Sequence, residues 1–176
     1  MTRGFSSGVF LLSAIAILVF TPAPLLGAQS ARLPDGPAVG ASIDQFLYEG
    51  ERLTAVSFRF SGLRAGKLGS EIGVGLFPDA LSSGALYLAP DLGPAFNASG
   101  PGFSLLLKGG LSSLAALGGG FAFIPGYHVG GGLIVQAGKR FGIRIDAVRH
   151  VYLAGEGSEA LWSVGLGFTG LPRRAN

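Results

Sequence analysis

A serine, a histidine and an aspartate are the side chains of this sequence whose types come nearest to a catalytic set. His150 lies four residues after Asp146 and thirteen residues before Ser163. A histidine held by an acid can activate a serine as a nucleophile. Catalysis also needs a local sequence that brings nucleophile, base and acid within reach, and neither GxSxG nor HExxH occurs. We therefore expect no catalytic residue.

Metal and cofactor chemistry also has weak support in the sequence. The chain contains no cysteine, which excludes disulfides, thiolate nucleophiles and cysteine-bound zinc. Its only histidines are His128 and His150, whereas a zinc site usually has four ligands. Gly165 to Gly170 matches GxGxxG by letter, but the chain ends six residues later, before the required helix and acidic residue. We expect no metal and no cofactor.

The composition points to an apolar environment. Of the 176 residues, 48% are hydrophobic, 13% are charged and 31 are glycine. A soluble domain carries charge on roughly a quarter of its residues, and a disordered chain is far less apolar. The net charge of +3 comes without any Lys/Arg run longer than two residues, so we expect no nucleic-acid partner. The length fits one domain.

The amino terminus has the pattern of an export signal. Arg3 precedes an apolar run over residues 9–20, a proline break and small residues near Ala28. This order predicts a cleaved signal peptide over residues 1–28, with an uncleaved signal anchor as the alternative. Residues 29–48 contain Pro34 and Pro37 and are predicted to form a periplasmic leader.

Four later segments alternate with a period of two. In residues 53–62, 67–78, 140–152 and 161–170, large apolar side chains share one face, and glycine, serine or charge shares the other. Such alternation predicts strands with one apolar face. The uncharged stretch between Lys108 and Lys139 resembles a membrane helix by hydropathy, but its many glycines would make a poor helix.

The face that carries glycine, serine and charge distinguishes a soluble sheet from a membrane barrel. A soluble sheet has a richly charged outer face, whereas a narrow membrane barrel turns bulky residues to lipid and small ones to its lumen. We predict an all-β fold: a single closed antiparallel up-and-down transmembrane β-barrel of about eight strands over residues 49–170, followed by a basic tail over 171–176. The candidate strands are 53–62, 67–78, 82–90, 102–110, 112–123, 128–138, 140–152 and 160–170.

Two sets of residues follow from this barrel. A hairpin loop centred on Ala65 would place Arg59 directly opposite Glu71 on the lumen face, and Arg144 and Asp146 share that face in a later strand. We expect lumen ion pairs from Arg59, Glu71, Arg144 and Asp146. Aromatic rings near predicted strand ends are expected at the membrane interface. They are Tyr87, Tyr127, Tyr152, Trp162 and Phe168.

A segment from about Tyr127 to Gly170, about a quarter of the chain, also resembles a known family. Gly130-Gly131-Gly132 is followed by a basic turn at residues 138–140, by FGIRIDAVRHVY over residues 141–152 and by LWSVGLGF over residues 161–168. This order resembles the closing hairpins of small bacterial outer-membrane β-barrel proteins of the OmpA-like and porin-like type. The resemblance implies an outer-membrane location, reached after secretion through the inner membrane. It also implies the barrel-assembly machinery as a partner during biogenesis.

The leading functional hypothesis is an outer-membrane barrel with a structural or narrow-pore role and no enzymatic activity, in contact with outer-membrane lipids. One alternative is a soluble periplasmic or secreted β-barrel that binds an apolar ligand in its cavity. The other is an outer-membrane lipid-modifying enzyme that would use His150 and Ser163.

Overall fold

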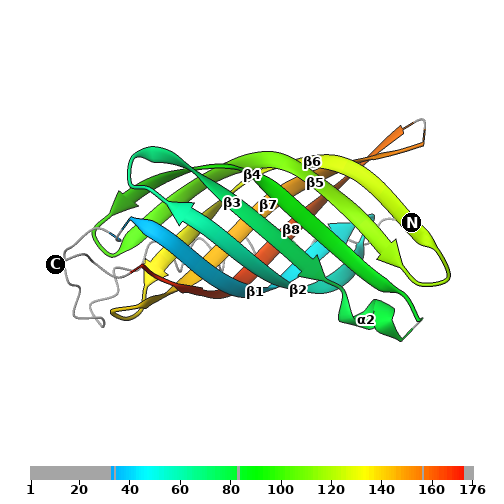
Figure 1. Cartoon of the computed structure of the whole chain (residues 1–176), viewed down its shortest axis with the longest axis horizontal. Helices are drawn as coiled ribbons and strands as arrows, with labels where there is room; N and C mark the ends of the chain where they lie inside the picture. The colour runs from blue at the N-terminus through cyan, green and yellow to red at the C-terminus, as the bar shows by residue number, and fades with distance from the viewer. Residues whose placement is uncertain (1–32, 34, 83, 156, 173–176) are drawn as a thin grey trace, which may run out of the picture.

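The computed structural model describes residue 33 and residues 35–82, 84–155 and 157–172, so the predicted signal peptide lies outside the described residues. Eight antiparallel strands form a closed barrel in which each strand pairs with the next and the last pairs with the first (Figure 1). This confirms the predicted fold class. The elements are β1 (Gly36–Tyr48), β2 (Glu51–Leu63), β3 (Lys67–Leu76), α2 (Pro78–Leu81), β4 (Leu86–Gly100), β5 (Phe103–Leu117), β6 (Phe121–Gln136), β7 (Phe141–Ala154) and β8 (Gly157–Gly170).

The two faces of the wall follow the predicted alternation. In β8, Leu166 is 60% exposed and Ser163 is 2% exposed. The same contrast holds in β2, where Phe58 and Phe60 are exposed while Arg59 is buried. The barrel therefore carries large apolar side chains outside and polar ones inside, the reverse of a soluble protein. Among the described residues, no helix is long and apolar enough to cross a membrane.

The predicted periplasmic leader is wrong over most of its length. Residues Gly36–Tyr48 form β1, which pairs with β2 along its whole length and with β8 over nine residues. Val39 and Ile43 face outward and Asp44 faces inward, so the strand alternates like the others. Pro37 is the second residue of β1, and a strand tolerates proline near its start. The proline concealed the alternation of this strand in the sequence. The barrel thus starts at Gly36.

The middle strands also differ from the prediction. The predicted strands 102–110 and 112–123 are mainly one strand, β5, which continues through Gly109 and Gly110 to the turn at residues 118–120. The predicted strand 82–90 begins instead with the turn after α2, and β4 starts only at Leu86. The total of eight strands is correct because one strand was missed and another was split.

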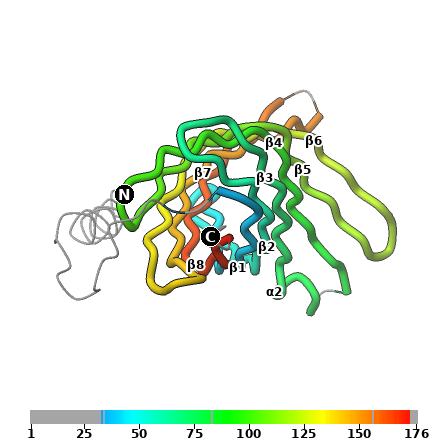
Figure 2. The backbone as a smooth tube through the Cα atoms, turned by 60° about the vertical axis from the view of Figure 1, so that its left-hand side comes forward, coloured from blue at the N-terminus to red at the C-terminus, as the bar shows by residue number. Residues whose placement is uncertain are grey.

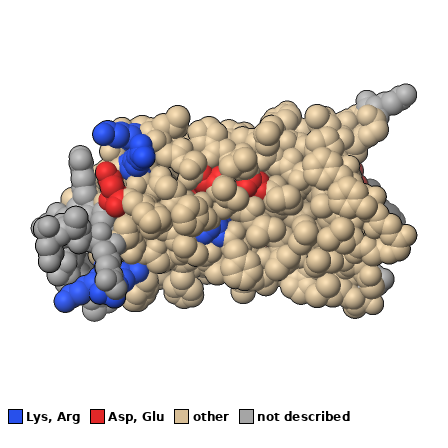
Figure 3. Space-filling model, viewed as in Figure 1, with Lys and Arg blue, Asp and Glu red and all other residues tan. Residues whose placement is uncertain are grey.

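The barrel has two distinct ends. β1 begins and β8 ends at the same end, here called the terminal end, and the connection that contains α2 lies at the opposite, distal end (Figures 1 and 2). The described termini and turns of the terminal end carry Arg64, Lys67, Lys139 and Arg140, and Figure 3 shows basic atoms gathered there. The wall between the ends is almost free of charge on its outer side in this view.

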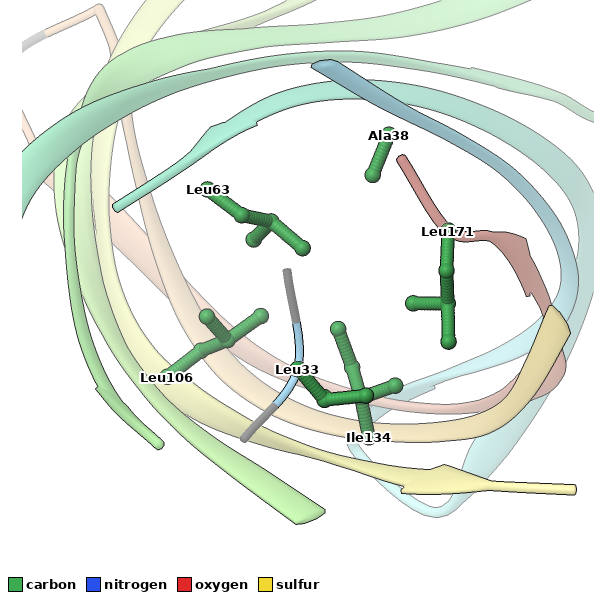
Figure 4. Close-up of a cluster of buried hydrophobic side chains, with 6 residues drawn as sticks. All are labelled: Leu33, Ala38, Leu63, Leu106, Ile134 and Leu171. Atoms are coloured by element: carbon green, nitrogen blue, oxygen red, sulfur yellow. The ribbon is translucent and has the colours of Figure 1, made fainter. Parts of the chain in front are cut away.

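A hydrophobic cluster lies inside each end of the barrel. The terminal cluster consists of Leu33, Ala38, Leu63, Leu106, Ile134 and Leu171, which point into the space enclosed by the strands, with Leu33 among them (Figure 4). The distal cluster consists of Phe46, Ala55, Phe77, Ala89, Tyr152 and Leu161. Apolar side chains therefore fill the lumen toward both ends.

The outer face generates the first prediction. Leu166→Arg should strongly impair insertion into lipid vesicles, because an arginine at the middle of the apolar band costs about 2–4 kcal/mol. Ser158→Arg adds the same charge to the same strand about 20 Å nearer the distal end, given a rise of about 3.3 Å per residue and a tilt of about 40°. The control should insert like the wild type, as measured by heat-modifiable gel mobility. Equal insertion of both variants would show that the outer face does not lie in lipid.

Candidate functional site

Seven charged side chains meet in the middle of the lumen, and we call them the charge ring. They come from six of the eight strands, and the side chain of each is at most 12% exposed. The members are Asp44 of β1, Arg59 of β2, Glu71 of β3, Asp91 of β4, Lys108 of β5, and Arg144 and Asp146 of β7. The ring lies between the terminal and distal clusters.

Four members form a closed circuit of alternating charge. Arg144 Nε donates to Asp146 Oδ2 at 2.6 Å, and Arg144 Nη2 lies 2.8 Å from the Glu71 carboxylate. Lys108 Nζ completes the circuit at 2.9 Å from Glu71 Oε1 and 2.9 Å from Asp146 Oδ1. Each of these charges has two opposite charges beside it. Buried ions repay their desolvation only with such complete pairing.

Arg59 links the other acids to this circuit. Its Nη2 lies 2.5 Å from Asp44 Oδ2 and its Nη1 lies 3.4 Å from Asp91 Oδ2. Serines of the same and of the adjacent strand supply further hydrogen bonds. The hydroxyls of Ser42 and Ser57 each donate to Asp44 at 2.7 Å. Ser61 donates to Glu71 Oε2 at 2.6 Å. The carboxylates thus have neutral donors as well as cations, which stabilises their charged form.

The structure brings the four predicted lumen residues together, with a different register. Arg59 lies across from Gly73, and Glu71 lies across from Ser61, so the β2–β3 pairing is shifted by two positions from the prediction. The turn closes from Lys67 N–H to Arg64 C=O, with Gly66 in the left-handed conformation that a residue with a side chain disfavours. An even shift leaves both charges inside the lumen. Arg59 Nη1 and Glu71 Oε1 are 3.9 Å apart.

Three members of the ring were not predicted. Asp44 lies in the segment taken for a leader, Asp91 lies between two prolines of β4, and Lys108 precedes the Gly109-Gly110 pair of β5. Interrupting residues concealed the strand of Asp44 and ended the predicted strand 82–90 just before Asp91. Lys108 lay within the predicted strand 102–110, but its lumen side was not assigned. A longer search for alternation through Pro90 or Gly109 could have found the last two.

Four of the five predicted interface aromatics face outward, and Tyr152 does not. Tyr87, Tyr127, Trp162 and Phe168 are exposed on the wall. Tyr152 is 2% exposed and belongs to the distal cluster, with its ring stacked beside His150 at a centroid distance of 6.0 Å. It lies an even number of residues after Arg144 and Asp146, so strand parity places it in the lumen. The assignment of Tyr152 to the interface is wrong.

Every charge of the ring lies across from a glycine on a neighbouring strand. A Cβ atom at Gly73 would lie 2.6 Å from Asp91 Oδ1, one at Gly132 would lie 2.5 Å from Asp146 Oδ1, and one at Gly165 would overlap the Asp44 carboxylate. The cross-strand pairs are Asp44–Gly165, Arg59–Gly40, Arg59–Gly73, Glu71–Gly93, Asp91–Gly73, Lys108–Gly130, Arg144–Gly167, Asp146–Gly132 and Asp146–Gly165. The lumen glycines make room for the charged side chains.

A polar layer separates the charge ring from the distal cluster. His150 Nε2 lies 3.0 Å from Ser163 Oγ, and the His150 ring lies across from His128 at a centroid distance of 6.1 Å. His150 Nδ1 has no hydrogen-bond partner among the described residues, and the Asp146 carboxylate is bound by Arg144 and Lys108. The serine and histidine therefore lack the orienting acid of a catalytic triad. Within the described ranges, no three histidine or acidic side chains are arranged to hold a metal ion.

Comparison with known proteins extends this description. No family model matches the sequence, and no curated protein does. Solved structures with a similar fold include the following three. The outer membrane protein OprG from Pseudomonas aeruginosa has a TM-score of 0.57 and 12% identity, over 84% of this chain and 100% of that one. Neisserial surface protein A has a TM-score of 0.55 and 15% identity, over 78% and 96%. The N-terminal β-barrel domain of Pseudomonas aeruginosa OprF has a TM-score of 0.54 and 13% identity, over 77% and 99%.

The chain has the fold of small outer-membrane barrels. At these identities the likeness extends to the fold alone. The side chains of the lumen have to be interpreted from this chain's own residues. The charge ring and its glycines are therefore the features from which a function has to be argued.

The glycines that lie across from the charge ring generate the second prediction. Gly165→Ala should lower the free energy of unfolding in urea by about 1–3 kcal/mol, because its Cβ would overlap the Asp44 carboxylate. Gly157→Ala changes the same strand where the nearest atom to the new Cβ is Ala154 O at 3.9 Å. This control should be nearly neutral. An equal loss in both variants would mean that glycine flexibility, and not room for the charge ring, explains the effect.

Proposed function

We propose that this protein is a structural barrel of the outer membrane whose lumen is closed to ions and solutes. The observation that supports this proposal most directly is the sequence of layers inside the barrel. The terminal cluster, the charge ring, the polar layer and the distal cluster follow one another along the lumen. A structural role is favoured over a narrow pore because these layers fill the cross-section.

The outer wall supports the membrane location. Its strands have 10 to 16 residues, and 9–11 residues suffice for a tilted strand to cross the hydrocarbon core. Large apolar side chains are exposed on all eight strands, which would be unfavourable in water over so continuous a surface. The fold shared with outer-membrane barrels agrees with this location.

The charge ring supports a closed lumen. In a water-filled pore, charged side chains are solvated and screened, whereas here the most exposed side chain of the ring is 12% exposed. A passing ion would have to separate Arg144 from Asp146 or Lys108 from Glu71, and unpairing buried charges is strongly unfavourable. It would also have to displace the apolar side chains of both clusters, including Leu33 and Phe46.

The positions of His150 and Ser163 argue against the enzymatic alternative. Both side chains are buried in the lumen between the charge ring and the distal cluster. A lipid that stays in the membrane contacts the outer wall, which carries neither of them. A lipid-modifying enzyme would need its nucleophile within reach of that lipid.

Planar bilayer recordings test the closed lumen, and they are the third prediction. The wild-type barrel, inserted into the bilayer, should show no ion-conductance steps in concentrated potassium chloride. Insertion has to be verified separately, by heat-modifiable mobility and protease protection of vesicles made from the same preparation. Reproducible conductance steps from verified wild-type protein would contradict the proposal and favour the narrow pore.

A further inference from the structure

The wall of the barrel is interrupted on one side, where β3, β4, β5 and β6 lie next to one another. Paired positions between β4 and β5 occur at residues 86–88, 91–92 and 95–100, with gaps at Pro90 and Pro94 and their neighbours. Proline has no N–H to donate to the ladder. A third proline, Pro125, stands in β6 across from Ser113. The pairing between β4 and β5 is thus interrupted near the middle of this side, while the β3–β4 and β5–β6 pairings beside it are continuous.

A pocket of about 310 Å³ opens at this interruption. That volume lies at the small end of the range for ligand pockets, about 300–1,000 Å³. Its outer lining is formed by exposed apolar side chains, Ile72, Leu92, Leu111 and Phe123. Asp91 and Ser112, which point toward the lumen side, are among its other lining residues. Figure 3 shows acidic atoms, and basic atoms close to them, in the middle of a wall that is otherwise uncharged between its ends. The pocket therefore joins an apolar outer surface to a polar inner end.

The inner end of the pocket carries a negative charge that the ring does not balance. The charge ring contains four carboxylates and three cations. Asp91 is the member held least tightly, because among the described cations only Arg59 reaches it, at 3.4 Å. Arg59 is closer to Asp44, at 2.5 Å. Asp91 also has the most exposed side chain of the ring, at 12%. A cation from outside would restore the balance at Asp91.

We propose that this pocket binds a single-chain amphiphile with a primary ammonium head. The ammonium group lies at Asp91 and donates a further hydrogen bond to Ser112 Oγ, and the alkyl chain lies on Leu92, Leu111 and Phe123. An ammonium is compact and has three donors, which suits a pocket with one carboxylate and one hydroxyl at its end. A bare metal ion would need several oxygen ligands in place of its water, and the lining is mostly apolar. The inference rests on the proposed function, because the open side of the pocket must face lipid.

Binding measurements with three twelve-carbon probes test this inference, and they are the fourth prediction. Native mass spectrometry of the barrel released from phosphatidylcholine vesicles at neutral pH compares dodecylamine, dodecanol and dodecanoate. The wild type should bind one dodecylamine, at least about tenfold more tightly than dodecanol, since a charge-assisted hydrogen bond contributes roughly 1.4 kcal/mol or more. Dodecanoate should bind most weakly.

Two variants separate the head from the chain. Asp91→Asn should abolish the preference for dodecylamine, and it should still fold because the remaining ring has three acids and three bases. Phe123→Ala should weaken all three probes by a similar factor and keep the preference. Asp79→Asn, which neutralises an acid of α2 outside the pocket, should change neither result.

Each outcome has a defined meaning. Equal binding of dodecylamine and dodecanol to the wild type, or a preference that survives in Asp91→Asn, would overturn the inference. Heat-modifiable mobility of the same vesicle samples reports insertion. A barrel that inserts and shows no dodecylamine preference refutes the pocket alone, whereas a barrel that does not insert refutes the proposed function.

Discussion

The room that glycine leaves beside each lumen charge is the constraint on which the rest of the structure depends. An eight-stranded barrel encloses a space just wide enough for side chains to fill. Seven charged side chains fit there because each lies across from a residue without a Cβ atom. With larger residues at Gly73, Gly132 or Gly165, the carboxylates of the neighbouring aspartates would be displaced from their cations. The high glycine content therefore has a geometric cause in the middle of the barrel.

Charge pairing follows from this confinement. Arg144, Lys108, Glu71 and Asp146 are far from water and are stabilised by one another in a closed circuit. Pairing across six strands also fixes the relative register of those strands, because a slip by one residue would turn a charge to the apolar face. In the proposed function, the interactions that stabilise the barrel also close its lumen. The pocket at Asp91 lies where this pairing is least complete.

The alternation of residues along the strands predicted the fold. The prediction was wrong where prolines or glycines interrupted this alternation. Residues 140–152 and 161–170 alternate without a break, so their faces and the position of Arg144 and Asp146 could be predicted. β1 and β4 contain prolines and β5 contains a glycine pair, and there the alternation is concealed. The contact between Arg59 and Asp44 depends on how β1 closes the barrel, which no local pattern contains. Tyr152 was misplaced because its position near a strand end outweighed its parity.

Thermodynamic coupling between Arg144 and Asp146 tests the dry charge ring most directly. The measurement is a double-mutant cycle with Arg144→Met and Asp146→Asn, by urea unfolding in lipid vesicles. Either single change leaves a buried charge incompletely paired, at a cost of about 3–5 kcal/mol, while the double change removes both. We expect the double variant to be more stable than the sum of the two losses predicts, with a coupling above about 1 kcal/mol. Additive losses would contradict the account, because they would mean that water already screens these charges and that the lumen is open.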